Sequence, residues 1–246
     1  MPRLSDFTTL TFDCYGTLID WERGMLAELG PWRARHGLTA TDADLLAAFA
    51  EAETRCEAET PTALYPSILA RTHVRMAQHF GAPADQEEAD RFGASVGRWP
   101  AFADTPGALA YLRRHYRLVV VSNVDRASFA MTREHLGVTF DRVITAEEVG
   151  SYKPHPGNFL YALRELRDAF GVEPEEVLHT AQSLFHDIAP AKALGLRTMW
   201  VNRRKGDGGW GATQPVDHGT ATPDFEVASL AEFVERHRAE KGGGVL

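Results

Sequence analysis

Cysteine is scarce in this sequence of 246 residues, which contains only Cys14 and Cys56. Two cysteines give no disulfide framework of the kind that supports small secreted domains. No run of apolar residues approaches the roughly 20 that a membrane-spanning helix requires. The first ten residues show neither a signal-peptide core nor an Arg- and Ser-rich transit pattern. These absences lead us to expect a cytoplasmic protein in a reducing compartment.

The chain also lacks an excess of basic residues. It has 26 Lys and Arg against 34 Asp and Glu, which gives a formal net charge of −8 at pH 7. Nucleic acids and anionic membrane surfaces attract basic proteins, so we expect neither as a partner. Core-forming residues are present in ordinary quantity, because 44% of the residues are hydrophobic and 24% are charged.

Strand-like and helix-like segments alternate over most of the chain. Strands are predicted at 7–12, 117–123, 142–145, 175–181, 197–202 and 224–228, and helices at 106–115, 126–136, 156–169, 187–194 and 230–240. Alternation of this kind is typical of βαβ units, so we predict an α/β fold with a parallel sheet flanked by helices. The stretch 21–98 shows helical periodicity only. We therefore predict a core formed by 1–20 and 99–246, with an inserted α-helical cap domain at 21–98.

Polar side chains follow four of the predicted strands at the point where each strand ends. Asp13 comes directly after the first strand, and Lys153 lies in the loop beyond the third. Ligands of open parallel sheets bind outside the carboxyl ends of the strands, so we expect an active site here. The other polar candidates at this edge are Tyr15, Thr17, Ser122, Asn123, Gln182, Ser183 and Asp187.

Four motifs occur together in a fixed order: DCYGTL at 13–18, SN at 122–123, KP at 153–154 and a late acid at Asp187. This set resembles the haloacid dehalogenase-like (HAD) hydrolase superfamily over essentially the whole chain. Within the superfamily it is most similar to the type II 2-haloacid dehalogenase-like branch. The resemblance implies a Rossmann-like core with an α-helical cap, and Asp13 as a nucleophile that forms a covalent ester intermediate.

The residue two positions after the nucleophile separates two chemistries in this superfamily. Its Mg²⁺-dependent phosphatases have a second aspartate there, which protonates the leaving alkoxide. This chain has Tyr15, and Ser183 stands where those phosphatases have the first acid of a late pair. Few carboxylates then remain to hold a dication. We therefore predict no metal ion and no cofactor, and a leaving group, such as a halide, that needs no proton.

The resemblance also implies the roles of the candidates. Asp13 attacks the carbon that bears the halogen of a small 2-halo carboxylic acid, and water then hydrolyses the ester, as in (S)-2-haloacid dehalogenases. Lys153 keeps Asp13 ionised, and Asp187 positions Lys153 or helps to activate the water. The predicted catalytic residues are thus Asp13, Thr17, Lys153 and Asp187. The predicted substrate-binding residues are Tyr15, Ser122, Asn123, Ser183 and Arg55.

Several residues depart from the dehalogenase pattern. Ala50 stands where those enzymes have the arginine that contacts the halide, and Arg33 and Arg55 are the candidate substitutes, of which Arg55 is assigned to the substrate. Phe159 and Leu184 replace an expected tyrosine and asparagine. Two alternatives therefore stay open: a Mg²⁺-dependent phosphatase of the same fold, and a non-catalytic binding protein on this scaffold.

The motif residues also have purely structural alternatives. Asp13 and Asp187 could serve only as helix N-caps, and Lys153 could be a solvated loop residue. As a partner we expect a small organic acid substrate. A homodimer is compatible with the resemblance, because some relatives are dimers.

Overall fold

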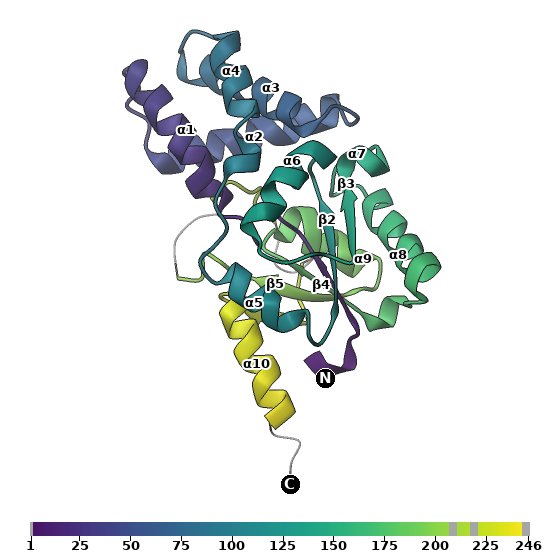
Figure 1. The fold of residues 1–246 in the computed structure, drawn as a ribbon. Coiled ribbons are helices and arrows are strands. Elements are labelled where there is room, and N and C mark those ends of the chain that lie inside the picture. Colours follow the sequence, from purple (N-terminus) through teal and green to yellow (C-terminus); the bar gives the residue numbers. More distant parts are fainter. Residues whose placement is uncertain (1, 207–210, 217–220, 243–246) are drawn as a thin grey trace.

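The computed structural model describes residues 2–206, 211–216 and 221–242 (Figure 1). One sheet of six parallel strands runs through it in the order β3-β2-β1-β4-β5-β6. The strands are β1 (Thr9–Phe12), β2 (Arg117–Ser122), β3 (Arg142–Thr145), β4 (Val177–Ala181), β5 (Arg197–Val201) and β6 (Phe225–Val227). β1 lies between β2 and β4, and Phe12 is in register with Val120 and Thr180. The predicted α/β sheet is confirmed.

The sheet is covered on both faces, which explains its uninterrupted apolar strands. Alternate residues of β2 enter different cores: Leu118 and Val120 pack on one side, and Val119 and Val121 on the other. The first core is closed by α5 (Thr105–Leu112), α6 (Arg126–Thr132) and α10 (Leu230–Gly242), and the second by α8 (Gly157–Phe170) and α9 (Ala189–Ala193). A strand buried on both faces has no polar side to present to water, so it reads as a continuous β-branched run.

Four helices between β1 and α5 form the predicted cap, and Figure 1 shows them as a group beyond one end of the sheet. They are α1 (Trp21–Arg35), α2 (Asp42–Glu59), α3 (Tyr65–Phe80) and α4 (Gln86–Gly93). Thr41 caps α2 by accepting a hydrogen bond from the backbone N–H of Asp44. Gly81 ends α3 with a φ of 70°, a conformation that favours glycine. The domain boundaries near 20 and 98 stay a prediction.

The remaining elements are short. They are α7 (Ala146–Val149), four 3₁₀ turns (Leu4–Asp6, Val96–Arg98, Arg133–His135 and Pro174–Glu176) and a π-helical turn (Leu184–Ile188). The π turn is a departure from the sequence prediction, which starts a helix at 187. Ser183 caps this turn, and its carbonyl accepts from the N–H of Ile188, five residues on. No helix in the described ranges is long and apolar enough to cross a membrane.

Candidate active site

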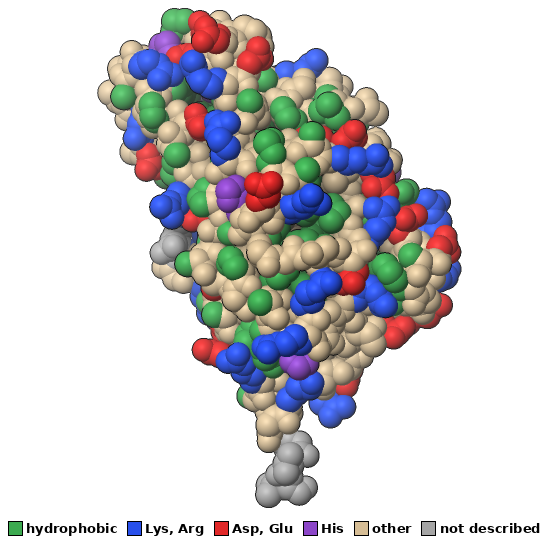
Figure 2. All heavy atoms as spheres, viewed as in Figure 1, with side chains coloured by type: hydrophobic (Ala, Val, Ile, Leu, Met, Phe, Trp, Pro, Cys, Tyr) green, Lys and Arg blue, Asp and Glu red, His purple; other side chains and the backbone are tan. Residues whose placement is uncertain are grey.

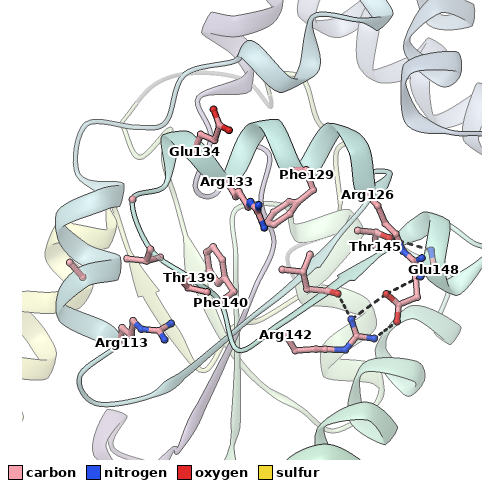
Figure 3. Close-up of a pocket in the computed structure, with 15 residues that line it drawn as sticks. Arg113, Arg126, Phe129, Arg133, Glu134, Thr139, Phe140, Arg142, Thr145 and Glu148 are labelled. Carbon is pink, nitrogen blue, oxygen red and sulfur yellow. Dashed lines mark hydrogen bonds and ion pairs between the residues drawn. The ribbon is translucent and has the colours of Figure 1, made fainter.

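Two of the hollows in the described part of the chain differ greatly in size and in lining. The larger, of about 1180 Å³, lies on the surface between α5, α6 and β3, and its walls include Arg113, Arg126, Arg133 and Arg142 (Figure 3). Arg126 and Arg142 are engaged in ion pairs with Glu148. Figure 2 shows acidic and basic side chains interspersed over this face of the molecule. The larger hollow contains no residue of the predicted site.

The smaller hollow encloses about 30 Å³ between the sheet edge and the cap. It is lined by Asp13, Tyr15, Trp21, Glu53, Glu57, Tyr65, Ser122, Asn123, Lys153, Gln182, Ser183, His186 and Asp187. Seven of these are residues that the sequence predicts for the site, and they converge from β1, β2, β4 and the loop before α8. Reactive groups rather than volume define an active site, so this cavity is the candidate.

Asp13 is held by two hydrogen bonds at the end of the central strand. Its Oδ2 accepts from Thr17 Oγ1 at 2.8 Å, and its Oδ1 accepts from Lys153 Nζ at 2.9 Å. Thr17 reaches back because Gly16 turns the chain with a φ of 91°, which L side chains rarely adopt. Thr17 Oγ1 in turn accepts from the Gln182 backbone N–H at 2.8 Å. The aspartate is thereby fixed in orientation, which is more than a helix-capping role requires.

Lys153 is a buried cation that joins the two acids of the site. Its side chain is 1% exposed, and its Nζ donates to Asp13 at 2.9 Å, to Asp187 at 2.6 Å and to the Val121 carbonyl at 2.9 Å. These bonds use all three donors of an ammonium group. Burial lowers the pKa of Lys153, whereas the negative charges of Asp13 and Asp187 raise it. The second effect is larger, so the pKa of Lys153 lies above the ordinary value. Lys153 is therefore charged, and it is not a solvated loop residue.

Asp187 receives hydrogen bonds from two sides. Its Oδ1 accepts from Lys153 and from His179 Nε2, the latter at 2.9 Å. Burial raises the pKa of Asp187, yet Lys153 and His179 together hold it below the ordinary carboxyl value. Its Oδ2 is buried and has no hydrogen-bond partner in the part of the chain that the structure describes. Asp187 thus offers an ionised oxygen to a ligand or a water molecule, and Ser183, not Asp187, caps the turn.

The electrostatic balance differs at Asp13. Burial raises the pKa of this carboxyl group, while Lys153 and Thr17 oppose the rise and the negative charge of Asp187 adds to it. One ammonium group serves two carboxylates, so the cluster of Asp13, Lys153 and Asp187 carries a net charge of −1 when all three are ionised. A carboxylate in this setting is more basic than an ordinary aspartate.

Asn123 connects the loop of Lys153 to the cap. Its Oδ1 accepts from the Lys153 N–H at 2.7 Å, and its Nδ2 donates to the Lys153 carbonyl at 3.0 Å and to Glu57 Oε1 at 3.2 Å. Ser122, 3% exposed, lines the cavity with an Oγ that has no hydrogen-bond partner among the described residues. Ser122 is therefore free to bind a ligand, whereas the side chain of Asn123 is already used to position its neighbours.

Tyr15 and Ser183 form walls of the cavity. The Tyr15 hydroxyl hydrogen-bonds with Thr132 Oγ1 at 2.8 Å. Burial raises the pKa of Tyr15 well above that of a free phenol, so it is a poor proton donor to a leaving group. Ser183 Oγ accepts from the His186 N–H at 3.0 Å as the cap of the π-helical turn. Both residues lie where the sequence predicts them, with their polar atoms engaged by the protein.

Arg55 does not reach the cavity. Its guanidinium pairs with Glu51, one turn earlier on α2, at 2.6 Å, and its side chain is 62% exposed. The residues of α2 that line the cavity are Glu53 and Glu57, and at 3.6 residues per turn position 55 lies on the opposite side of the helix. The structure corrects the expectation that Arg55 replaces the missing arginine at Ala50, because Arg55 lies outside the cavity.

Glu53 and Glu57 are acids of the cavity that the sequence motifs do not predict. They are 4% and 6% exposed, and the Tyr65 hydroxyl donates to Glu53 Oε1 at 2.5 Å. Burial raises the pKa of Glu53 to about 7 and that of Glu57 well above its ordinary value. The sequence does indicate on which side of the helix they lie. Glu53 and Glu57 follow the buried Phe49 at intervals of four residues, which places all three on the apolar face of α2.

The raised pKa of Glu53 predicts a dependence of stability on pH. The folded protein holds this proton up to about pH 7, whereas a solvated glutamate releases it near 4.5. Stability therefore falls as pH rises from about 4.5 to 7, by up to ~3 kcal/mol for this group. Glu53→Gln removes the titration, so its melting temperature should exceed that of the natural protein more at pH 8 than at pH 5. Thermal melts at both pH values test this, and an equal difference at the two would contradict it.

Comparison with known proteins places these features in a family. The model of the haloacid dehalogenase-like hydrolases matches residues 7–195, which is more than half of the chain. A phosphoserine phosphatase of Thermus thermophilus is 31% identical over 156 residues, which cover 62% of this chain and 57% of that protein. The (S)-2-haloacid dehalogenase 1 of a Pseudomonas species is 26% identical over 136 residues, or 54% of each. The match thus spans just over half the length of these curated relatives.

The fold is that of solved dehalogenases. The structure of L-2-haloacid dehalogenase from Xanthobacter autotrophicus superposes with a TM-score of 0.71 at 19% identity, over 96% of this chain and 99% of that one. Likeness at this level of identity concerns the fold, including the α-helical cap. The family match over residues 7–195, a range that includes Asp13, Lys153 and Asp187, shows that this chain belongs to the haloacid dehalogenase-like hydrolases.

Proposed function

We propose that this hydrolase cleaves a carbon–halogen bond by a covalent mechanism on Asp13, without a metal ion, in the manner of (S)-2-haloacid dehalogenases. The main support for this proposal is the set of contacts that Asp13 makes. Its two oxygens are engaged by Thr17 at 2.8 Å and Lys153 at 2.9 Å, while the position two residues on holds Tyr15. These contacts support Asp13 as the nucleophile, and a phenol bound to Thr132 stands where an alkoxide leaving group would need an acid.

The chemistry has two steps. In the first, a carboxylate oxygen of Asp13 attacks the carbon that bears the halogen, the carbon–halogen bond breaks, and the halide leaves with its electron pair. In the second, water attacks the carbonyl carbon of the Asp13 ester, and the alcohol product leaves with the original Asp13 oxygen. The free Oδ2 of Asp187 is the candidate base for that water, because its low pKa keeps it ionised. One oxygen atom from water remains on Asp13.

A second candidate is a Mg²⁺-dependent phosphatase, which the sequence similarity to the phosphoserine phosphatase favours. The residues present fit the ion poorly. Lys153 Nζ lies between the two acids that would hold it, 2.9 Å from Asp13 and 2.6 Å from Asp187, so a dication would have to displace or share this ammonium. Among the described residues, no three His, Cys, Asp or Glu side chains are grouped as a metal site. The proposed mechanism therefore uses no metal ion.

Halide release in the presence of EDTA tests the proposal. The panel comprises chloroacetate, bromoacetate, both enantiomers of 2-chloropropionate, and chloroalkylamines of matched length. A single turnover in H₂¹⁸O, read by mass spectrometry of the Asp13 peptide, reports the origin of the oxygen. We expect halide release that EDTA does not affect, and ¹⁸O in Asp13.

Other outcomes select other functions. Turnover of phosphate esters that requires Mg²⁺ and stops with EDTA would establish the phosphatase instead. A folded protein with no turnover on either panel, and no loss of binding in Asp13→Asn, would favour a non-catalytic binding protein on this scaffold.

A further inference from the structure

The cavity above Asp13 is dominated by carboxylates. Two of them, Asp13 and Asp187, belong to the family pattern, and the cap adds Glu53 and Glu57 from one face of α2. Tyr65 and Asn123 each donate to one oxygen of these glutamates, at 2.5 and 3.2 Å. Four acids at 6% exposure or less therefore surround a space of about 30 Å³.

Positive charge is scarce in the same walls. Among the described residues that line the cavity, Lys153 is the one lysine or arginine, and its three donors are already bound to Asp13, Asp187 and the Val121 carbonyl. His186 also lines the cavity, but burial lowers its pKa to about 4, so it is neutral at physiological pH. A carboxylate on the substrate would meet four acids here and would find no free cation.

The remaining walls are of the kind that bind organic cations. Tyr15, Trp21 and Tyr65 line the cavity, and the rings of Tyr15 and Tyr65 lie 6.1 Å apart. Aromatic faces attract ammonium groups, most strongly where water is excluded. Ser122, which is 97% buried, adds an Oγ with no hydrogen-bond partner in the described part of the chain. This unpartnered hydroxyl in the same cavity indicates that a polar ligand completes it.

We propose that the molecule that reacts with Asp13 carries a positively charged alkylammonium group, which Glu53 and Glu57 bind against the aromatic walls. The inference rests on the proposed function in that it takes Asp13 as the reacting group. It changes the substrate class from a halogenated acid to a halogenated amine. The ammonium group faces α2, and the carbon with the leaving group faces Asp13 at the end of β1. The cavity has room for about two water molecules, so the ligand must be a compact one.

Binding of unreactive products tests the proposal without any need for turnover. Ethanolamine and glycolate are the alcohols that hydrolysis of a two-carbon chloroamine and of chloroacetate would give. Titration calorimetry at pH 8, above the pKa of Glu53 near 7, compares the two with the full-length protein. We expect ethanolamine to bind at least tenfold more tightly than glycolate. Equal binding, or tighter binding of glycolate, would overturn the proposal.

Variants of α2 identify the groups responsible. Glu53→Gln and Glu57→Gln keep the shape of the side chains but cannot become negatively charged when the ammonium group binds, so each should weaken ethanolamine binding about tenfold and leave glycolate unchanged or tighter. Glu51→Gln is the matched control, because Glu51 lies on the same helix, is 58% exposed and pairs with Arg55 outside the cavity. Unchanged ethanolamine affinity in both cavity variants would contradict the assignment, provided that their melts show a folded protein.

A separate result distinguishes this proposal from the proposed function. Asp13→Asn should retain the preference for ethanolamine, because the ammonium group is bound by the cap. If that preference is present but no chloroamine is turned over, the binding proposal stands and the dehalogenase proposal fails. If chloroacetate is turned over faster than any chloroamine, Asp13 chemistry stands and the ammonium site is wrong.

Discussion

Asp13→Asn should reduce turnover by about 10⁴-fold or more, since removal of a nucleophile costs most of the rate acceleration of a covalent enzyme. An amide oxygen is a far weaker nucleophile than a carboxylate, and nothing else that lines the cavity occupies its place at the end of β1. The loss should lie in the chemical step, so substrate affinity should change little. Steady-state halide release and a single-turnover measurement of the ester on residue 13 test this. Retained activity would remove Asp13 as the nucleophile.

The same substitution should leave the fold intact or stabilise it. Burial and the nearby Asp187 raise the pKa of Asp13, so the ionised form is held at a cost in folding free energy. With asparagine in its place, Lys153 and Asp187 remain as a neutral pair at 2.6 Å. The melting temperature at pH 8 should thus be equal to or above that of the natural protein. Asp42→Asn, at an exposed residue of α2 that pairs with Arg33, is the control for a generic loss of an aspartate.

The sheet and the residues at its edge could be predicted from the sequence because both follow from local rules. A parallel strand buried on two faces must be apolar along its length, and its carboxyl end must point to the shared edge. The sequence pattern therefore suffices to group Asp13, Lys153 and Asp187 at one edge. The distances of 2.9 Å from Lys153 to Asp13 and 2.6 Å from Lys153 to Asp187 depend on loop geometry, which the pattern does not contain.

The cap is harder to predict for a physical reason. Helix periodicity gives the apolar face of α2, but glutamate is usually solvated, so the pattern alone does not indicate that two acids on this face are buried. Glu53 and Glu57 are buried because the sheet edge and Tyr65 cover that face, and this is a tertiary contact. The same contact explains why the prediction for Arg55 is wrong, since that residue lies near Ala50 along the chain but not around the helix. The π-helical turn before α9 is not predicted for a different reason: it begins after Ser183, whose side chain caps it, and helical periodicity does not distinguish a π turn from an α turn.

Lys153→Ala should lower both activity and stability. Lys153 supplies the charge that opposes the raised pKa of Asp13, and losing one such preorganised contact costs on the order of 10²–10³-fold in rate. It also leaves two buried carboxylates without their shared cation, a change that typically costs ~3–5 kcal/mol of folding free energy. Lys153→Met, which keeps the length of the side chain, should lose nearly as much, because the charge and not the volume is missing. Lys205→Ala, at a 54% exposed lysine that pairs with Glu226, should change stability by ~1 kcal/mol or less.

The pH dependence of this variant separates electrostatics from packing. Without Lys153, burial and mutual repulsion raise the pKa values of Asp13 and Asp187 above the unfolded value of 3.8. A folded pKa above the unfolded one gives stability that is present at low pH and lost as pH rises through the folded value. The deficit of Lys153→Ala in unfolding free energy should hence be smaller at pH 5 than at pH 8, and the acid limb of any residual activity should move to higher pH. Urea unfolding and rate profiles at these pH values test both. A deficit independent of pH would mean that Lys153 acts by filling space, and the charge-pairing role assigned to it would be wrong.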